Sequence, residues 1–290
     1  MVVSPAALPI HAGTAAHQIV SDAKAKAVTM LLRKDGAEVI AIPQPSHAWL
    51  SGQMMRAWGN ERFAAPAPHE EVCLASELHD IGWLSWEKAP VLDSETGLPQ
   101  QFSRVPPKIH VALWHEGVRH ARAFGRYPAL LVSLHADTIY ARHFDFAKAH
   151  PADAEAVRAF LDEQHGFQAR MAASLRTEPG VGALAAAENI ARNQHLIGAL
   201  DWLSLEICWG VREEKKIPHV PIAEGNCELS VRPRGGPHDL ILDPWPFHQA
   251  SLAVRAEGKR LSGRFSRQDE LLRALDEAEP VLVTATLHKA

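Results

Sequence analysis

A chain of 290 residues, of which 47% are hydrophobic and 22% charged, has the composition of an ordinary soluble globular protein. Its formal net charge of −4 provides no electrostatic footprint for nucleic acid or an anionic membrane, and no apolar run approaches the length of a transmembrane helix. Three cysteines without a Cys-x-x-Cys pair argue against a disulfide framework, and no secretory signal is recognisable, so we expect a cytoplasmic protein.

The chain is predicted to begin with a tail and a β-hairpin. Residues 1–25 are rich in alanine and small polar residues and show no periodicity. In residues 26–45, two apolar runs flank the turn signal Asp35-Gly36. An Asp-Gly pair between apolar runs is a strong hairpin signal, because glycine accepts positive φ at no steric cost. We therefore assign residues 26–45 to a hairpin.

From Pro45 to about Arg212 the sequence has the periodicity of helices. The first helix is expected from the N-cap Ser46 to Trp58, with Gly59 as its stop signal. Further helices are expected at residues 70–81, 108–124, 128–144, 151–175, 181–192 and 193–211. Residues 90–107 are long for a connection and are expected to form either a lid or a surface loop.

After Arg212, proline and glycine punctuate short alternating runs that are typical of strands. The expected strands lie at residues 227–231, 240–242, 252–254, 260–261 and 281–285, with a short helix at 267–277. The hairpin is expected to join these strands, because pairing would cover edges of both. The sequence therefore predicts a mainly α protein, with a helical core at 46–212 and a smaller β-rich unit built from the hairpin at 26–45 and the strands at 213–290.

Five side chains of metal-ligand type are dispersed over four of the predicted helices: His47, the pair His79-Asp80, His135 and Asp201. They follow the order H…HD…H…D. A His-Asp dipeptide by itself does not indicate a metal site, because a second one occurs at His238-Asp239. That second pair enters a probable strand, where neighbouring side chains point to opposite faces, so we interpret it as structural.

Asp80 and Asp201 lie where carboxylates are costly. Lone acids near a helix C-terminus are disfavoured by about 0.3–1 kcal/mol, and Asp80 lies at such an end. Asp201 lies in an almost wholly apolar helix, where a bare carboxylate costs several kcal/mol unless it is paired or bound to metal. A bound cation would offset both costs. The alternatives are a surface His79-Asp80 pair, a buried ion pair at Asp201, and hydrogen bonds alone at His47 and His135.

In their order, these residues resemble the ligand pattern of the HD-domain superfamily of metal-dependent phosphohydrolases. More closely, longer motifs resemble an uncharacterised bacterial family classed as a domain of unknown function. These motifs are Gln44-Pro45-Ser46-His47-Ala48, His79-Asp80-Ile81-Gly82-Trp83, the segment 127–135, Asp201-Trp202-Leu203-Ser204-Leu205 and Asp243-Pro244-Trp245-Pro246-Phe247. The resemblance covers about residues 28–285 and implies an HD-domain-like helical bundle, but the family brings no settled activity with it.

The superfamily resemblance implies that four of these residues hold one metal ion: His47, His79, Asp80 and Asp201. Two-metal members add two further histidines, and His135 matches the second of them. His110 and His115 compete for the first, and we prefer His115 because His-Glu-x-Gly recurs in some dinuclear members. A lysine often follows the His-Asp pair in phosphohydrolase members. In this chain the pair is followed by Trp83 and Trp86 instead.

The sequence therefore favours a metal-dependent hydrolase of a phosphoester, such as a nucleotide or a small phosphorylated metabolite. One or two divalent ions (Fe, Mn, Zn or Mg) would polarise the phosphoryl group and activate water. Asp80 would bridge two ions, and His115 or His110 would act as general acid or base beside a single ion. The alternatives are an HD-type di-iron oxygenase and a non-catalytic metal- or ligand-binding module. The expected partner is a small anionic molecule, with neither nucleic acid nor membrane, and a homodimer is compatible with the sequence.

Overall fold

The computed structural model describes residues 30–290, so the predicted tail at 1–25 and the start of the hairpin segment lie outside the described residues. The helices of the described part are α2 (Gln44–Ala57), α3 (His69–Leu78), α4 (Trp83–Trp86), α5 (Pro107–Arg122), α6 (Arg126–His143), α7 (Pro151–Arg176), α8 (Ala187–Trp209) and α9 (Gln268–Glu277), with the 3₁₀ helices η1 (Phe102–Arg104) and η2 (Gly182–Ala185). The strands are β1 (Leu31–Asp35), β2 (Glu38–Ile42), β3 (Leu92–Asp93), β4 (Leu98–Pro99), β5 (Lys215–Pro221), β6 (Asn226–Gly236), β7 (Asp239–Asp243), β8 (Ser251–Leu261) and β9 (Pro280–Lys289).

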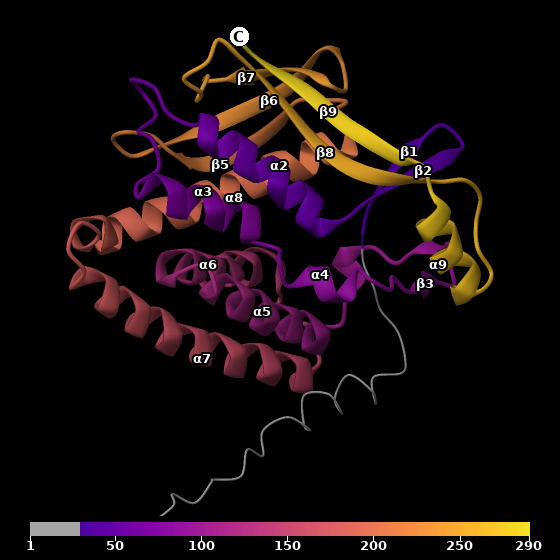
Figure 1. The fold of residues 1–290 in the computed structure, drawn as a ribbon, viewed down its shortest axis with the longest axis horizontal. Coiled ribbons are helices and arrows are strands. Elements are labelled where there is room, and N and C mark those ends of the chain that lie inside the picture. The colour runs from indigo at the N-terminus through magenta and orange to yellow at the C-terminus, as the bar shows by residue number, and fades with distance from the viewer. Residues whose placement is uncertain (1–29) are drawn as a thin grey trace, which may run out of the picture.

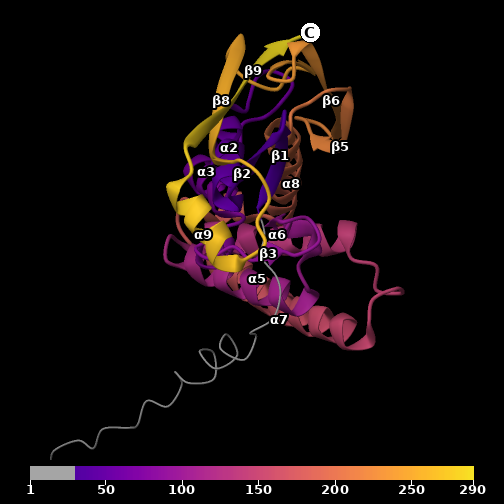
Figure 2. The same cartoon turned by 90° about the vertical axis from the view of Figure 1, so that its right-hand side faces the viewer.

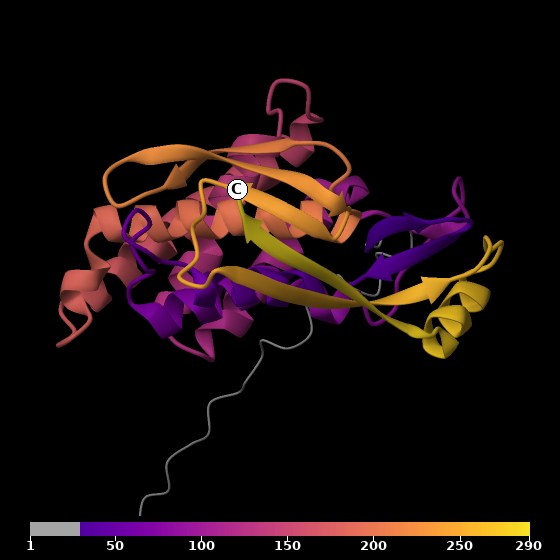
Figure 3. The same ribbon diagram turned by 90° about the horizontal axis from the view of Figure 1, so that it is seen from above.

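Seven of the strands form one sheet in the order β1-β2-β8-β9-β7-β6-β5. Its pairs are antiparallel except for β7 and β9, which are parallel. The sheet curls into a half-barrel, and α2 and α8 pack against it and against each other. Figures 1 and 2 show α5, α6 and α7 as a further layer on the side of these helices that faces away from the sheet. Seen from above, the strands cross over α8 and α2 (Figure 3).

The prediction of a mainly α protein is wrong. Of the described residues, 49% are helical and 24% lie in strands, so the chain has an α/β fold. β5 occupies a segment in which Pro218 and the neighbouring lysines suggest a boundary after the helical part of the chain. β8 runs without interruption through several charged positions. Along β8, Arg255 and Glu257 are exposed while Val254 and Ala256 are buried. A strand with one solvated face carries charges at alternate positions without ending, which is why the sequence signals underestimate it.

The predicted hairpin is present as β1 and β2, joined by a two-residue loop of Gly36 and Ala37. Gly36 has a φ of +64°, a left-handed conformation that glycine adopts without steric cost. β2 pairs with β8, so the hairpin extends the C-terminal strands in the same sheet. Arg260 of β8 secures the hairpin by hydrogen bonds to Asp35 Oδ2 at 2.8 Å and Glu38 Oε2 at 2.7 Å.

Helices α2, α3, α6 and α8 share one hydrophobic cluster with the sheet, so they do not form a bundle apart from the strands, whereas α5 and most of α7 pack with α6 in a second cluster. The sequence predicts two helices, at 181–192 and 193–211. The structure has one long helix, α8, with the short 3₁₀ helix η2 directly before it. Leu200 and Leu203 of α8 belong to the same buried cluster as Val231 of β6. A helix that is apolar on most sides is stable when it is enclosed, and here the sheet and the outer helices enclose it. Within residues 30–290, no helix combines the length and apolarity needed to cross a membrane.

The connection at 90–107 is docked against α9. Gln268, the first residue of α9, accepts a hydrogen bond from Leu92 N at 2.8 Å and donates one to Pro90 O at 2.6 Å. Figures 1 and 2 show α9 beside β3, in agreement with these contacts. Of the two alternatives that the sequence left open, the structure shows the surface loop.

Candidate metal centre

Four segments bring the five predicted ligand residues together, and we call this set the His/Asp cluster. His47 lies in the first turn of α2, His79 and Asp80 directly follow α3, His135 lies in α6 and Asp201 in the middle of α8. Two overlapping groups result, one of His47, His79 and Asp80 and one of His79, His135 and Asp201. Within each group, one candidate ligand atom per residue lies within 4.8 Å of the others. These buried groups could hold a metal ion.

The His79 side chain has the orientation of a metal ligand. Its ring is buried, and Nδ1 donates a hydrogen bond to Ser76 O at 2.8 Å. Its Nε2 makes no hydrogen bond of good geometry and faces Asp201 Oδ1 at 3.4 Å and Asp80 Oδ2 at 3.8 Å. Histidines that bind metals commonly donate their other ring N–H to a backbone carbonyl, which fixes the tautomer. The Ser76 carbonyl has this role for His79.

The Ser204 hydroxyl gives His47 the same orientation. Ser204 Oγ donates its only hydrogen to Asp201 O at 2.7 Å, so it accepts from His47 Nδ1, which lies 2.9 Å away. The proton on Nδ1 is thereby fixed, and Nε2 faces Asp80 Oδ2 at 2.9 Å. Because two lone pairs would repel each other at this distance, a proton or a metal ion must lie between Nε2 and Asp80 Oδ2.

Asp201 divides its carboxylate between two histidines. Oδ1 lies 3.4 Å from His79 Nε2, and Oδ2 lies 3.5 Å from His135 Nε2. The centroids of these two rings are 4.8 Å apart. His135 Nδ1 is buried and has no hydrogen-bond partner among residues 30–290. The candidate ligand atoms of the cluster therefore form a continuous series of close contacts from His47 to His135.

The carboxylates and imidazoles of the cluster stabilise one another's charges. Burial opposes ionisation of Asp201, but His79 above all, with His135 and His47, holds the pKa of Asp201 well below its usual range. His79 and His47 likewise lower the pKa of Asp80 against the effect of burial. Burial also opposes a charge on His79, yet Asp80 and Asp201 raise its pKa to about 9. Near neutral pH the cluster thus holds two carboxylate charges and a proton on His79, and a divalent cation that displaces this proton would balance both carboxylates.

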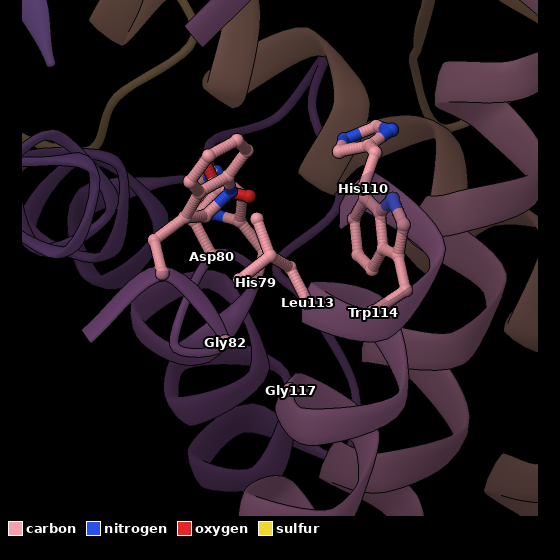
Figure 4. Close-up of a pocket in the computed structure, with 8 residues that line it drawn as sticks. His79, Asp80, Gly82, His110, Leu113, Trp114 and Gly117 are labelled. Carbon is pink, nitrogen blue, oxygen red and sulfur yellow. Dashed lines mark ion pairs between the residues drawn. The ribbon is translucent and has the colours of Figure 1, made fainter. Parts of the chain in front are cut away.

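A small cavity of about 10 Å³ lies beside His79 and Asp80. α4 contributes Trp83 to its wall, and α5 contributes His110 and Trp114, which face the His-Asp pair in Figure 4. A cavity of this volume holds about one water molecule. The surroundings are mostly aromatic, so the cavity joins the polar cluster to an apolar wall.

The structure brings His110, and not His115, next to the His79-Asp80 pair. The two histidines are five residues apart on α5, which places them about 140° apart around the helix. The His110 ring lies 5.8 Å from the Trp83 ring, and burial lowers the His110 pKa to about 4. His115 faces α7 instead, where its Nδ1 lies 3.8 Å from Glu163 Oε1. The preference for His115 as a residue of the centre therefore has no geometric support.

A family model described as "Protein of unknown function (DUF3891)" matches residues 30–263, which is most of the chain. The chain belongs to this family. The matched segment contains the whole His/Asp cluster and ends after β8, so α9 and β9 lie outside it. The match agrees with the predicted resemblance to a family of unknown function, whereas the relationship to the HD-domain superfamily stays a prediction. No curated protein and no solved structure shows significant similarity to the chain.

Three supporting residues of this DUF3891 chain were not predicted to contribute to the cluster. Ser76 and Ser204 orient the histidine rings, and each lies three residues from a cluster residue on the same helical face, His79 and Asp201 respectively. That spacing is the sequence signal that could have identified them. Glu87 has no such signal, since both of its carboxylate oxygens lie 3.0 Å from the backbone N of the first residue of α2. It therefore anchors the helix turn that carries His47.

The second His-Asp pair lies apart from the cluster and has structural contacts. His238 hydrogen-bonds through Nε2 with the guanidinium of Arg33, which belongs to the hairpin. Asp239 Oδ1 forms an ion pair with His288 Nε2 at 2.9 Å. The two side chains thus have different partners, in agreement with their interpretation as structural residues.

Proposed function

We propose that the His/Asp cluster binds one or two divalent metal ions and that the protein uses them to hydrolyse phosphoesters. One observation carries the proposal. Nδ1 of His47 and of His79 is anchored by a neighbouring oxygen, which directs Nε2 of both rings toward the Asp80 carboxylate. Buried imidazole nitrogens that share a point with carboxylate oxygens are typical metal ligands. The order of these residues along the chain supports hydrolysis, because it resembles that of HD-domain phosphohydrolases.

The donor set favours Fe, Mn or Zn over Mg. Three imidazoles stand beside two carboxylates, whereas Mg²⁺ prefers oxygen ligands and retains much of its water. His79 belongs to both ligand groups, but its Nε2 has a single lone pair and can bind only one ion. If two ions bind, a bridging ligand must therefore be a carboxylate, which has two oxygens. Asp80 and Asp201 are the two carboxylates in the cluster.

The residues that line the cavity would orient the water and the reacting groups. When bound, a divalent ion supplies a Lewis acid and an activated water. His110 is neutral at pH 7, because burial lowers its pKa to about 4, so it can accept a hydrogen bond from a water in the cavity. The buried Trp83 and Trp114 rings line the same cavity. His110 therefore replaces His115 as our candidate for the acid–base residue.

The size of the cavity supports a second candidate function, a non-catalytic metal-binding module. The space beside His79 and Asp80 is about 10 Å³, which is much smaller than a phosphoester. Hydrolysis therefore requires the cavity to widen, whereas metal binding alone requires no such movement. Metal content and turnover, measured on the same preparation, distinguish the two functions.

The test is metal analysis of the purified full chain, combined with phosphate release from a panel of nucleotides and sugar phosphates. We expect one or two Fe, Mn or Zn ions per chain and phosphate release that depends on them. Bound metal without turnover would favour the non-catalytic module. Two irons with a redox-active absorption spectrum and no phosphate release would favour a di-iron oxygenase. A chain that binds none of these ions after reconstitution would contradict all three functions.

Metal affinity is expected to rise with pH. In the metal-free protein the pKa of His79 is about 9, above its ordinary value of 6.5, because of Asp80 and Asp201 against the effect of burial. An incoming ion must displace this proton, so the apparent affinity should increase as the pH rises toward 9 and then level off. The stability of the metal-free fold changes with pH in the opposite direction. The proton on His79 stabilises this fold fully below pH 6.5, and the stabilisation is lost as the pH rises through 9.

Calorimetric titration with Zn²⁺ in two buffers of different ionisation enthalpy measures the released protons directly. Release at neutral pH that disappears above pH 9 is the expected result. An affinity that is independent of pH, without proton release, would contradict the prediction.

A further inference from the structure

A groove of about 320 Å³ lies between α5 and α7, apart from the cavity of the metal centre. α5 contributes Glu116, Arg119 and Arg122 to its lining, and α7 contributes Glu163, Gln164, Phe167 and Arg170. The cavity beside His79 is lined by other residues of α5, so the two spaces use different faces of this helix. The volume of the groove is at the lower end of the range for small-molecule sites, about 300–1,000 Å³.

Gln164 gives the groove a hydrogen-bond donor. The side chain is 3% exposed, and its Oε1 accepts a hydrogen bond from Ser133 Oγ at 2.9 Å. This bond fixes the orientation of the amide. The NH₂ group of Gln164 has no hydrogen-bond partner among residues 30–290, although the residue lines the groove. Because this NH₂ group lies at the groove without a protein acceptor, the site suits a ligand that brings an oxygen acceptor.

Two guanidinium groups of the groove have no acidic partner. In the described part of the chain, no carboxylate oxygen lies within 4.0 Å of Arg122 or Arg170. Arg122 lies over the Phe167 ring, 5.9 Å from its centroid, which holds its charge at the groove. Arg119 differs, because it pairs with Glu116 on the same helix. Glu116 and Glu163 also line the groove, but Glu116 pairs with Arg119, and Glu163 Oε1 lies 3.8 Å from His115 Nδ1. The guanidiniums of Arg122 and Arg170 and the amide of Gln164 are therefore the donors of the groove that remain for a ligand.

We infer that this groove binds a small polyanion, whose phosphate or carboxylate groups are held by Arg122, Arg170 and the amide of Gln164. Guanidinium groups bind phosphate and carboxylate by paired, charge-assisted hydrogen bonds. This site is distinct from the His/Asp cluster and does not depend on metal binding there.

The test is calorimetric titration of the full chain with inorganic pyrophosphate and with citrate, after removal of metal with a chelator. The two probes separate phosphate from carboxylate chemistry, and metal removal prevents them from binding through an ion. We expect saturable binding of at least one probe at one site per chain. In R122Q/R170Q the affinity should fall at least about tenfold, since each charge-assisted hydrogen bond is worth about a factor of ten or more. Gln164→Met should also weaken binding.

Arg158→Gln is the matched control. Arg158 lies on the same helix, also stacked on an aromatic ring, with its guanidinium 5.0 Å from the Phe146 centroid and outside the groove. Its substitution should leave the affinity unchanged, and circular dichroism should show intact helices in every variant. Three results would overturn the inference: no saturable binding of either probe, an equal loss in Arg158→Gln, or binding that Asp201→Asn abolishes while R122Q/R170Q retains it.

Discussion

Replacing Asp201 by Asn is expected to weaken the binding of Zn²⁺ at least about 100-fold. Groups that only support a metal ligand already contribute about 10- to 100-fold in affinity, so a ligand itself should contribute more. Asp201 provides the oxygens that lie 3.4 Å from His79 Nε2 and 3.5 Å from His135 Nε2. Asn retains the shape of the side chain but removes the negative charge that balances a cation. Competition with a chromogenic chelator measures the change.

Asp239→Asn is the control for this prediction, because it makes the same substitution in the second His-Asp pair. Asp239 pairs with His288 near the surface and contacts no residue of the cluster. Its substitution should leave Zn²⁺ affinity unchanged. If D201N binds Zn²⁺ as tightly as the unaltered chain, or if both variants lose affinity equally, the His/Asp cluster is not the metal site.

Replacing Gly82 by Ala is expected to lower the free energy of unfolding by about 3 kcal/mol, at the upper end of the usual cost of overpacking. A Cβ at this position would lie 2.1 Å from Leu113 O and 3.0 Å from Gly117 N. Both atoms are backbone of α5, so no side-chain rotation relieves the clash. α5 must shift relative to the His79-Asp80 segment. Urea denaturation, followed by the circular dichroism of the helices, measures the loss.

Gly236→Ala is the matched control, because no atom lies within 4 Å of a Cβ added there. We expect little change in stability for this variant. Because α5 also carries His110, the G82A variant should in addition alter the environment of Trp114 in the cavity wall, which fluorescence can detect. Equal stability of G82A and the unaltered chain would show that α4 and α5 are not in close contact in solution.

The parts of the fold that follow from local chemistry were predictable. Asp35-Gly36 predicts the hairpin, because the left-handed turn is a property of the glycine itself. The cluster residues could be identified for a similar reason. A carboxylate such as Asp201 in an apolar helix carries a desolvation cost that is evident from its neighbours in the sequence, and the structure buries it among histidines.

The share of β-structure was not predictable, because strand pairing depends on distant segments. β5 and the second half of β8 carry prolines and charges that indicate loops when they are considered alone. In the protein they are strands, because each pairs with a neighbour and exposes its charged face to solvent. The continuity of α8 has the same origin, since the layers on either side of it supply the burial that stabilises its length.

The sequence by itself thus determined which residues are chemically out of place in an apolar helix, because that depends on neighbours along the chain. Only the tertiary structure decided how they are arranged. Ring orientation depends on Ser76 and Ser204, and the choice between His110 and His115 depends on which face of α5 lies against the His-Asp pair. Both depend on the packing of segments that are far apart in sequence, and such packing leaves no periodic signal in the chain.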